Sequence, residues 1–313
     1  MTFTKLVKNE LTTIPANHSE MLAEFAAFLN LSCEFHIENG EKSIHFQTKN
    51  PTITKRFLLL SKALYDTDTE LLQKESMKFS KKPLIILKLI KNVNKIINEH
   101  DYLGNPVENM RLLTQNEEEK KALLRGAFIV SGSVNHPNTK EYHLEIFANK
   151  QDEIIYIQSL MNYFNLNARI TKRRNGYIAY LKDAESISDF IKILGATNAV
   201  FKYEDIRIKR DFNNSINRIM NCEIANEKKT YQAALEQLEN IKVIKKHLSF
   251  HDLDDKIIRV MELREKYPEA NLRELSELYD KEYDDTLSRS GINHRFRKIK
   301  ELASNFKEES KWF

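Results

Sequence analysis

The sequence predicts an α+β protein: a repeat of helix, two strands, helix, two strands and helix occurs twice, and an all-helical domain follows. The first observation is the stretch Leu124–Val134, LRGAFIVSGSV, whose apolar positions share one helical face and whose two glycines let a second helix approach closely. The second is that Phe25–Phe35, FAAFLNLSCEF, has the same layout. The third is that each copy precedes a His-containing strand, starting at Ser43 or Tyr142, and then another helix.

The segments of the chain follow from this duplication and from local composition. Gly104 and Pro106 mark a connector between the copies, and the pattern becomes continuously helical from Tyr203. The expected order is a lead-in at 1–18, a first repeat at 19–100, a connector at 101–115, a second repeat at 116–202, linking helices at 203–250 and a C-terminal domain at 251–313.

Within the repeats, the expected elements are set by periodicity and by turn residues. Pro51 fits the first turn of a helix, and Asn135–Pro137 fits a turn between strands. Arg173 to Gly176 predicts a hairpin, because Asn-Gly suits a type I′ turn. The first repeat is expected to contain helices Ser19–Leu31 and Thr52–Tyr65 and strands Cys33–Ile37, Ser43–Thr48, Leu71–Phe79 and Leu84–Ile90.

Composition excludes several classes of protein. The chain has 313 residues, enough for two or three domains, and is 41% hydrophobic and 30% charged. Cys33 and Cys222 are its only cysteines, so neither a disulfide framework nor a cysteine-ligated zinc site is expected. Met1–Pro15 lacks the apolar run of a signal peptide, and no stretch approaches the ~18 apolar residues of a membrane span, so we expect a cytoplasmic protein.

Basic residues occur in three runs that contain no acid. They lie between Glu41 and Asp66, from Ser76 to Asn98, and from Arg169 to Lys182. Any one run is explained by a solvated strand face or helix end. Three such runs, interpreted as lying on strands or strand edges of the repeat, favour a surface that binds a polyanion. The hairpin residues Lys172, Arg173 and Arg174 are candidates for contacts with a phosphate backbone.

The expected linking region contains a dense polar segment, Asn217–Asn226, NRIMNCEIAN. Such a segment on a helix fits either a polar interface with a neighbouring domain or a surface facing DNA, and we favour the interface. The following Tyr231–His247 predicts an amphipathic helix that connects the repeats to the last domain.

The C-terminal domain has the pattern of a helix-turn-helix at about 272–304. Asp254–Tyr267 is helical, Asn271 with Glu274 forms a capping box, and Ser288 can cap a last helix whose apolar stripe includes Ile292 and Phe296. A plain amphipathic surface helix would have the same stripe, but the two preceding capped helices favour DNA binding. The expected DNA-binding residues are Ser288, Arg289, Ser290, Asn293, His294, Arg295, Arg297, Lys298 and Lys300.

The repeat resembles that of the LAGLIDADG homing endonucleases, and LRGAFIVSG resembles their signature helix. In single-chain members of that group, an acidic residue just before the last glycine of each signature helix holds the metal ions for cleavage. The resemblance puts Ser131 at this position in the second copy and Ser32 in the first, with Cys33 in place of the last glycine. Two neutral hydroxyls do not hold Mg²⁺ tightly, so both metal positions are degenerate and no cofactor is expected.

Together with NRIMNCEIAN and LSRSGINHRFRKIKELA, the repeat gives the chain a resemblance over nearly its full length to the WhiA family of Gram-positive sporulation and cell-division regulators. The resemblance implies a duplicated LAGLIDADG-like αββαββα domain without nuclease activity, joined to a helix-turn-helix and acting at promoters and on the nucleoid. Double-stranded DNA is the expected partner, together with other division or nucleoid proteins. A monomer is expected, because one chain supplies both repeats.

Two other functions remain open from the residues. One is an active nuclease that uses other acids, such as Glu34 or Glu145, although neither has the symmetric placement that cleavage by two metal ions requires. The other is an RNA-binding, maturase-like protein or scaffold, in which the basic sheet would bind RNA and the helix-turn-helix would have no role in binding. The leading hypothesis is a non-enzymatic DNA-binding regulator of transcription, cell division and chromosome segregation.

Overall fold

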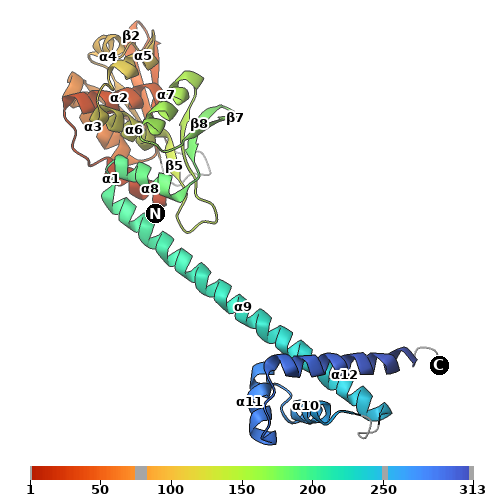
Figure 1. Cartoon of the computed structure of the whole chain (residues 1–313). Coiled ribbons are helices and arrows are strands. Elements are labelled where there is room, and N and C mark those ends of the chain that lie inside the picture. Colours follow the sequence, from red (N-terminus) through yellow and green to blue (C-terminus); the bar gives the residue numbers. More distant parts are fainter. Residues whose placement is uncertain (1, 75–82, 249–252, 310–313) are drawn as a thin grey trace. The chain divides into compact units, whose positions relative to one another are not determined.

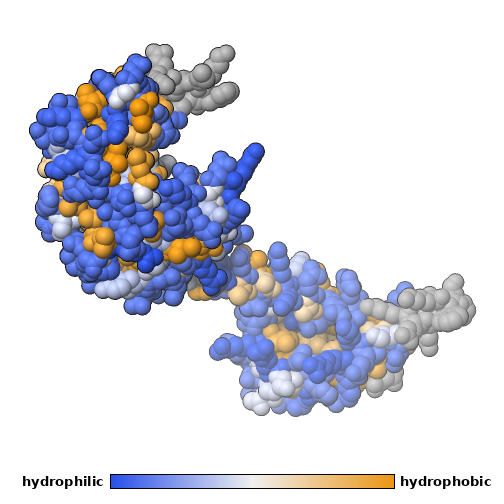
Figure 2. Space-filling model, turned by 90° about the horizontal axis from the view of Figure 1, so that it is seen from above, coloured by the Kyte–Doolittle hydropathy of each residue, from blue (hydrophilic) through white to orange (hydrophobic). Residues whose placement is uncertain are grey.

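The computed structural model describes residues 2–74, 83–248 and 253–309. It divides into two compact units, Met1–Asp211 and Phe212–Phe313, with the boundary inside the helix α9, Thr197–His247 (Figure 1). On the face shown in Figure 2, hydrophilic residues cover most of each unit and hydrophobic residues are exposed among them. Among the described residues, no helix is both long and apolar enough to cross a membrane.

The first unit contains the repeat twice, with the same order of elements in each copy. The first copy consists of α2 His18–Ser32, β1 Cys33–Glu38, β2 Glu41–Thr48, α3 Pro51–Tyr65, β3 Thr69–Lys74, β4 Leu84–Leu89 and α4 Val93–Glu99. The second consists of α6 Glu117–Ser131, β5 Gly132–Val134, β6 Leu144–Ala148, α7 Gln151–Tyr163, β7 Arg169–Arg173, β8 Gly176–Leu181 and α8 Ala184–Ile193.

The two sheets confirm the predicted duplication. Both are antiparallel, with strand orders β1-β2-β4-β3 and β5-β6-β8-β7. Their registers also correspond, since Cys33 pairs with Phe46 in the first sheet and Gly132 with Ile146 in the second. One part of the predicted strand Leu71–Phe79 lies outside the described residues.

The turn chemistry differs from the prediction at one hairpin. Arg173 pairs with Gly176, so Arg174 and Asn175 form the β7–β8 turn, and Gly176 with φ +154° already belongs to β8. The two-residue Asn-Gly turn with positive φ is instead Asn39–Gly40, which joins β1 to β2 with φ values of 52° and 84°. Positive φ at both positions is the requirement of a type I′ turn, and it fixes the register of this hairpin.

Two segments contribute more to the first unit than the sequence indicated. The expected lead-in contains α1, Phe3–Leu11, whose Phe3, Val7 and Leu11 are buried in the main core. The expected connector contains α5, Pro106–Leu112, whose Val107 and Met110 are buried there as well. Both helices therefore belong to the fold of the repeats.

The second unit has its own core, formed by three helices and the end of α9. The helices are α10 Asp255–Lys266, α11 Leu272–Tyr283 and α12 Arg289–Glu309. Ile241 and Ile244 of α9 are buried in the same cluster as Ile292 and Phe296 of α12. The second unit thus begins earlier than residue 251, because the end of the expected linking region covers the helix-turn-helix.

Candidate nucleic-acid interface

The helices α2 and α6 pack side by side along the centre of the first unit (Figure 1). The close approach depends on small residues, since a Cβ built on Gly126 would lie 2.6 Å from the carbonyl oxygen of Glu24 and 3.0 Å from the Cβ of Ala27. The helices then direct their C-terminal ends, Ser32 and Ser131, into the first strands of the two sheets.

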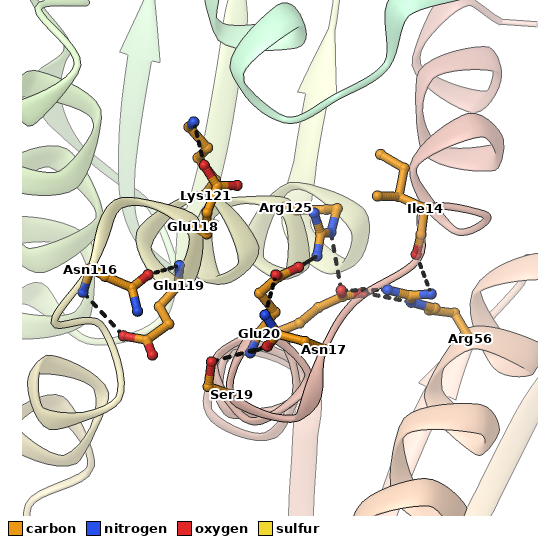
Figure 3. Close-up of polar contacts among 11 residues, drawn as sticks. Ile14, Asn17, Ser19, Glu20, Arg56, Asn116, Glu118, Glu119, Lys121 and Arg125 are labelled. Atoms are coloured by element: carbon orange, nitrogen blue, oxygen red, sulfur yellow. Dashed lines mark hydrogen bonds and ion pairs between the residues drawn. The ribbon is translucent and has the colours of Figure 1, made fainter.

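A buried ion network crosses this helix pair. The carboxylate of Glu24, fully buried, accepts from Arg56 Nε at 2.8 Å and Nη2 at 2.6 Å, and from Arg125 Nε at 3.1 Å. Arg56 also donates to the carbonyl of Ile14, and Arg125 lies 3.9 Å from Glu20. Figure 3 shows Arg56 and Arg125 pointing to the same place from different elements. The network joins α2 and α3 of the first copy to α6 of the second.

The degenerate metal positions are the last residues of the two central helices. The hydroxyl of Ser131 donates to the carbonyl of Ala127 at 3.0 Å, inside its own helix. Ser32 and Ser131 are both half-buried. Gly132 follows Ser131, and a Cβ at this position would lie 2.3 Å from the ring of Phe128, so the packing requires glycine. The equivalent residue of the first copy is Cys33, which is buried.

The two acids considered for an alternative cleavage site, Glu34 and Glu145, each have partners of their own and are not arranged around a common metal position. Glu145 bonds to His143 Nε2 at 2.9 Å and to Arg173 Nη2 at 3.2 Å. Partial burial raises the pKa of Glu145, but these partners outweigh it and hold the pKa below its usual value. Glu34 is exposed and lies 3.4 Å from His36.

The two sheets expose matching rows of residues with different charge. Side chains alternate along strands, so residues next to the buried Ile146 and Phe46 point to the exposed face. In the first sheet this row, across the strands, is Glu34, His45, Lys88 and Glu70. In the second it is Ser133, Glu145, Tyr180 and Arg169.

The exposed face of the second sheet is the more basic. Arg173 lies on the same face as Arg169, four residues further along β7, and Lys182 lies over the ring of Tyr180 at 5.5 Å. Arg174 is exposed at the turn, whereas Lys172 points to the opposite side of β7. The predicted trio of Lys172, Arg173 and Arg174 is therefore exposed but does not share one face.

The first sheet has a more neutral face. Lys88 pairs with Glu70 at 3.5 Å, and the rings of His36 and His45 stack at 4.0 Å. Partial burial, followed by the neighbouring His36 and Lys88, lowers the pKa of His45, which favours the neutral ring at pH 7. A polyanion would therefore find fewer uncompensated cations on this sheet.

The first basic run lies only partly on a strand, since Lys42 is in β2 and Lys49 follows directly after it. Lys55, Arg56 and Lys62 lie on α3, and Arg56 is buried against Glu24. Of the second run, residues up to 82 lie outside the described residues, and Lys91 pairs with Asp66 at 3.3 Å. Within the described residues, the third run comes nearest to the predicted basic sheet surface.

The helix α12 combines a buried stripe with an exposed polar face, as the sequence predicts. Ile292, Phe296, Ile299 and Ala303 are buried. Ser288 caps the helix, since its hydroxyl accepts the amide of Gly291 at 3.2 Å. A Cβ on Gly291 would lie 2.8 Å from Cδ1 of Leu287, the end of a flexible side chain that can shift. The Gly291 amide is thus engaged in the helix cap.

Most of the predicted reading residues are accessible on α12. Asn293 and Arg295 are half-buried, and Arg295 donates to the carbonyl of Gly291 at 3.0 Å. Lys300 lies 2.7 Å from Glu236 of α9. These two cations thus have partners within the unit. The predicted residues that are exposed are Ser288, Arg289, Ser290, His294, Arg297, Lys298 and Lys300.

The acidic stretch before α12 is compensated by cations of α10. Asp285 bonds to Lys256 at 2.9 Å, and this bond holds the pKa of Asp285 below its usual value. Glu282 bonds to Lys266 at 2.7 Å. The acids before α12 therefore stabilise the turn, and their charge is partly neutralised before a polyanion approaches.

A buried arginine that the sequence pattern did not indicate positions α12. Arg264 donates to Gln237 of α9 and to the carbonyl of Ala270, and its guanidinium lies 5.4 Å from the ring centroid of Phe296. Burial lowers the pKa of Arg264 to about 10, so the group remains charged at pH 7. The only signal in the sequence is a charged residue within an apolar stripe, next to Leu263.

Among the residues that the structure describes, no group of three or more His, Cys, Asp or Glu side chains is arranged to hold a metal ion. On the two candidate surfaces, α12 and the second sheet, the accessible polar groups include arginine, lysine, asparagine, serine and histidine side chains. These groups donate to phosphate oxygens and to base edges, which is the chemistry of nucleic-acid recognition.

Comparisons with known proteins agree with this arrangement. Residues 18–101 match the WhiA N-terminal LAGLIDADG-like domain, 120–213 the WhiA LAGLIDADG-like domain and 216–303 the WhiA C-terminal HTH domain. Proteins described as "Probable cell division protein WhiA" are 41% identical in Enterococcus faecalis, covering 99% of this chain and 100% of the relative, and 40% identical in Oceanobacillus iheyensis, covering 98% of each.

The fold of the whole chain is also found in a solved structure. The crystal structure of full-length DUF199/WhiA from Thermatoga maritima has a TM-score of 0.58 at 23% identity and covers 98% of this chain and 99% of that one. The HTH match begins at residue 216, inside α9, which agrees with the contribution of α9 to the second core. The chain belongs to the WhiA family, with a duplicated LAGLIDADG-like domain and a C-terminal helix-turn-helix domain.

Proposed function

We propose that this protein is a non-enzymatic DNA-binding regulator of transcription that takes part in cell division and chromosome segregation and acts on the nucleoid. The curated relatives are named as probable cell division proteins, and the family has an HTH domain. The observation that carries the proposal is α12, which presents Asn293 and Arg297 one turn apart beside its buried stripe, with Arg297 exposed and Asn293 half-buried.

The chemistry of this face fits base reading. Arginine can bond to O6 and N7 of guanine, and asparagine to N6 and N7 of adenine. The N-terminal part of the second helix of a helix-turn-helix is the part that enters the major groove. Arg289, Ser290 and His294 lie in that part and extend the candidate surface, while Arg297, Lys298 and Lys300 continue it along α12.

The experiment begins with footprinting across the genome to identify a bound site. Asn293→Ala and Arg297→Ala are each expected to cost ~1–3 kcal/mol at this site and much less on random duplex. Lys300→Ala is the comparison variant, with a smaller expected loss because Lys300 already pairs with Glu236. Equal losses on specific and random DNA would show that Asn293 and Arg297 contact only phosphates.

The exposed face of the second sheet is proposed as a further, sequence-independent DNA surface. Arg169, Arg173 and Arg174 are exposed there, and the equivalent row of the first sheet ends in Glu70. A titration with duplex DNA and structured RNA of equal length separates this proposal from an RNA-binding scaffold. Preference for RNA, unchanged by Arg297→Ala, would favour the scaffold.

The absence of nuclease activity is part of the proposal. It is supported by serine at both metal positions and by the bonds that engage Ser131 and Glu145. Without carboxylates there, the site lacks the hard anionic ligands that Mg²⁺ prefers. Supercoiled plasmid bearing a bound site, incubated with the protein and Mg²⁺ or Mn²⁺, should stay intact; nicking that is abolished by Ser32→Ala and Ser131→Ala would overturn the non-enzymatic function.

A further inference from the structure

The helix α9 carries an apolar ridge that the proposed DNA-binding function does not use. Half of the large hydrophobic side chains that are exposed in the described part of the chain lie on this one helix. Five of them, Ile208, Phe212, Ile216, Met220 and Ile224, follow one another at steps of four, the spacing of a ridge along an α-helix. We define these five residues as the α9 ridge.

The exposure of the ridge is unusual for a surface helix. Phe212 is 65% exposed and Met220 52%, and Ile219 beside the ridge is 60% exposed. The polar segment Asn217–Asn226 is exposed at every position. A contiguous exposed apolar surface on a long helix marks an interaction site.

We propose that the α9 ridge is a homodimer contact in which α9 of a second copy of this chain packs antiparallel, about a two-fold axis at Ile216. Antiparallel reversal about Ile216 places Phe212 at the level of Met220 of the second copy, and Ile208 at the level of Ile224. Successive ridge residues turn by about 40° around the helix, so Phe212, Ile216 and Met220 face the second copy and form the self-complementary centre that an isologous contact requires, while Ile208 and Ile224 lie at its margins.

The charges beside the ridge favour a second copy of α9 as the partner, and they favour the antiparallel over the parallel arrangement. The same reversal brings Lys209 to the level of Glu223 of the second copy, and by symmetry this opposite-charge pair occurs twice. A parallel arrangement would place Lys209 beside Lys209 and Glu223 beside Glu223, which is unfavourable. Farther out, Asp205 would face Glu227, so the contact ends within the span Ile208–Ile224.

The extent of the ridge sets the expected strength. One side of one helix is less than the ~800 Å² per partner that a standard stable interface buries, so association in free solution is weak. Duplication within the first unit removes the need for two chains to form the repeat fold, which is why the sequence predicts a monomer. It leaves the α9 ridge uncovered, and a dimer through α9 would present two helix-turn-helix domains, as many proteins of this kind do.

Sedimentation velocity of the full-length chain without DNA tests the contact, because it does not depend on the proposed function. The sedimentation coefficient should rise with concentration for the wild type and stay constant for Ile216→Glu. The matched control is Ile155→Glu on α7, similarly exposed at 45% against 38% for Ile216, which should associate as the wild type does. Concentration-independent sedimentation of the wild type, with no cross-linking in the next experiment, overturns the proposal.

Cross-linking tests the two-fold axis. In a Cys222→Ser background, where the remaining Cys33 is buried, Ile216→Cys should form a disulfide-linked dimer under mild oxidation. Asn214→Cys is the control, because two residues place it a little over half a turn round the helix. Equal cross-linking from both positions would indicate random collision and would reject the axis.

Charge exchange tests the direction. Glu223→Lys should weaken association several-fold, and adding Lys209→Glu should restore it, because the pair is then re-formed with reversed signs. Failure of the double variant to recover would overturn the antiparallel register. If Ile216→Glu leaves association unchanged but abolishes binding to random DNA, the ridge is a DNA-facing surface and the dimer proposal is wrong.

Discussion

The charge of Glu24 should contribute several kcal/mol to the stability of the first unit. The informative change is Glu24→Gln, which keeps the volume of the side chain and removes its charge. Glu24 is fully buried and is the shared anion of Arg56 and Arg125, both 5% exposed. Removing one partner of a buried ion pair leaves an uncompensated charge and costs about 3–5 kcal/mol.

The structure limits how far the two arginines can compensate. Arg56 would keep its bond to the carbonyl of Ile14, but Arg125 would keep only Glu20 at 3.9 Å. We therefore expect a loss near the middle of the range. With a urea dependence of ~2–3 kcal/mol per molar for a unit of this size, the midpoint of unfolding should fall by about 1–2 M.

The assay must separate the two units, because one global transition is not expected for a chain of two domains. Pulse labelling with deuterium at increasing urea concentration, measured by mass spectrometry, reports the first unit from peptides of α6 and the second from peptides of α11. Only the α6 midpoint should shift. Glu20→Gln is the control, expected to cost less than ~1 kcal/mol because its ion pair is long and reaches the surface. Equal shifts for Glu24→Gln and Glu20→Gln would refute the reasoning.

Four further outcomes are expected. Gly126→Ala should destabilise the first unit by ~1–3 kcal/mol in the same assay, because its Cβ would lie 2.6 Å from the Glu24 carbonyl; an unchanged midpoint would mean that the helices separate freely. Burial lowers the pKa of His100 to about 4, so between about pH 6.5 and 4 the unfolded chain binds a proton that the folded chain does not. The free energy of unfolding should therefore decrease by up to ~1.4 kcal/mol for each unit by which the pH is lowered in this range, and His100→Gln should flatten this dependence in acid titrations of unfolding. Reversing Lys172, Arg173 and Arg174 to Glu should weaken binding to all DNA sequences and reduce the slope of log K against log salt by ~0.9 for each phosphate that the protein no longer neutralises, and an unchanged slope would place these residues in solvent. Ser32→Asp with Ser131→Asp should weaken DNA binding in metal-free buffer through repulsion of phosphate without restoring cleavage; unchanged binding would place these helix ends away from DNA.

The architecture of the repeat can be predicted from the sequence because the same pattern of apolar residues occurs in both copies. The same apolar pattern before two His-containing strands predicted the sheets, and the common strand order and the family matches confirm the duplicated fold. The lead-in helix was missed although Phe3, Val7 and Leu11 follow at steps of four, because a single short stripe is weak evidence. The helix α5 was missed because Pro106 was interpreted as part of a linker, whereas it occupies the first turn.

The buried ion groups could not have been predicted by periodicity. Glu24 stands on α2 at the position that Leu123 occupies on α6, so the duplication itself suggests an apolar residue there. Its partners Arg56 and Arg125 lie 32 and 101 positions away. Only tertiary packing brings them together, and the same holds for Arg264 with Gln237.

The position of these acids bears on the proposed loss of cleavage. Glu20 and Glu24 are the carboxylates of the central helix α2, and both lie in its first half. Glu24 precedes Ser32 by eight residues, which is about 12 Å along a helix. The Glu24 carboxylate is moreover bonded to two guanidinium groups, so it cannot turn towards the helix end without leaving both charges buried. The central helix pair thus keeps its negative charge for its own stability, while the ends that adjoin the sheets carry hydroxyls. A protein built in this way can present its sheets to a polyanion without a fixed carboxylate at Ser32 or Ser131 to repel it.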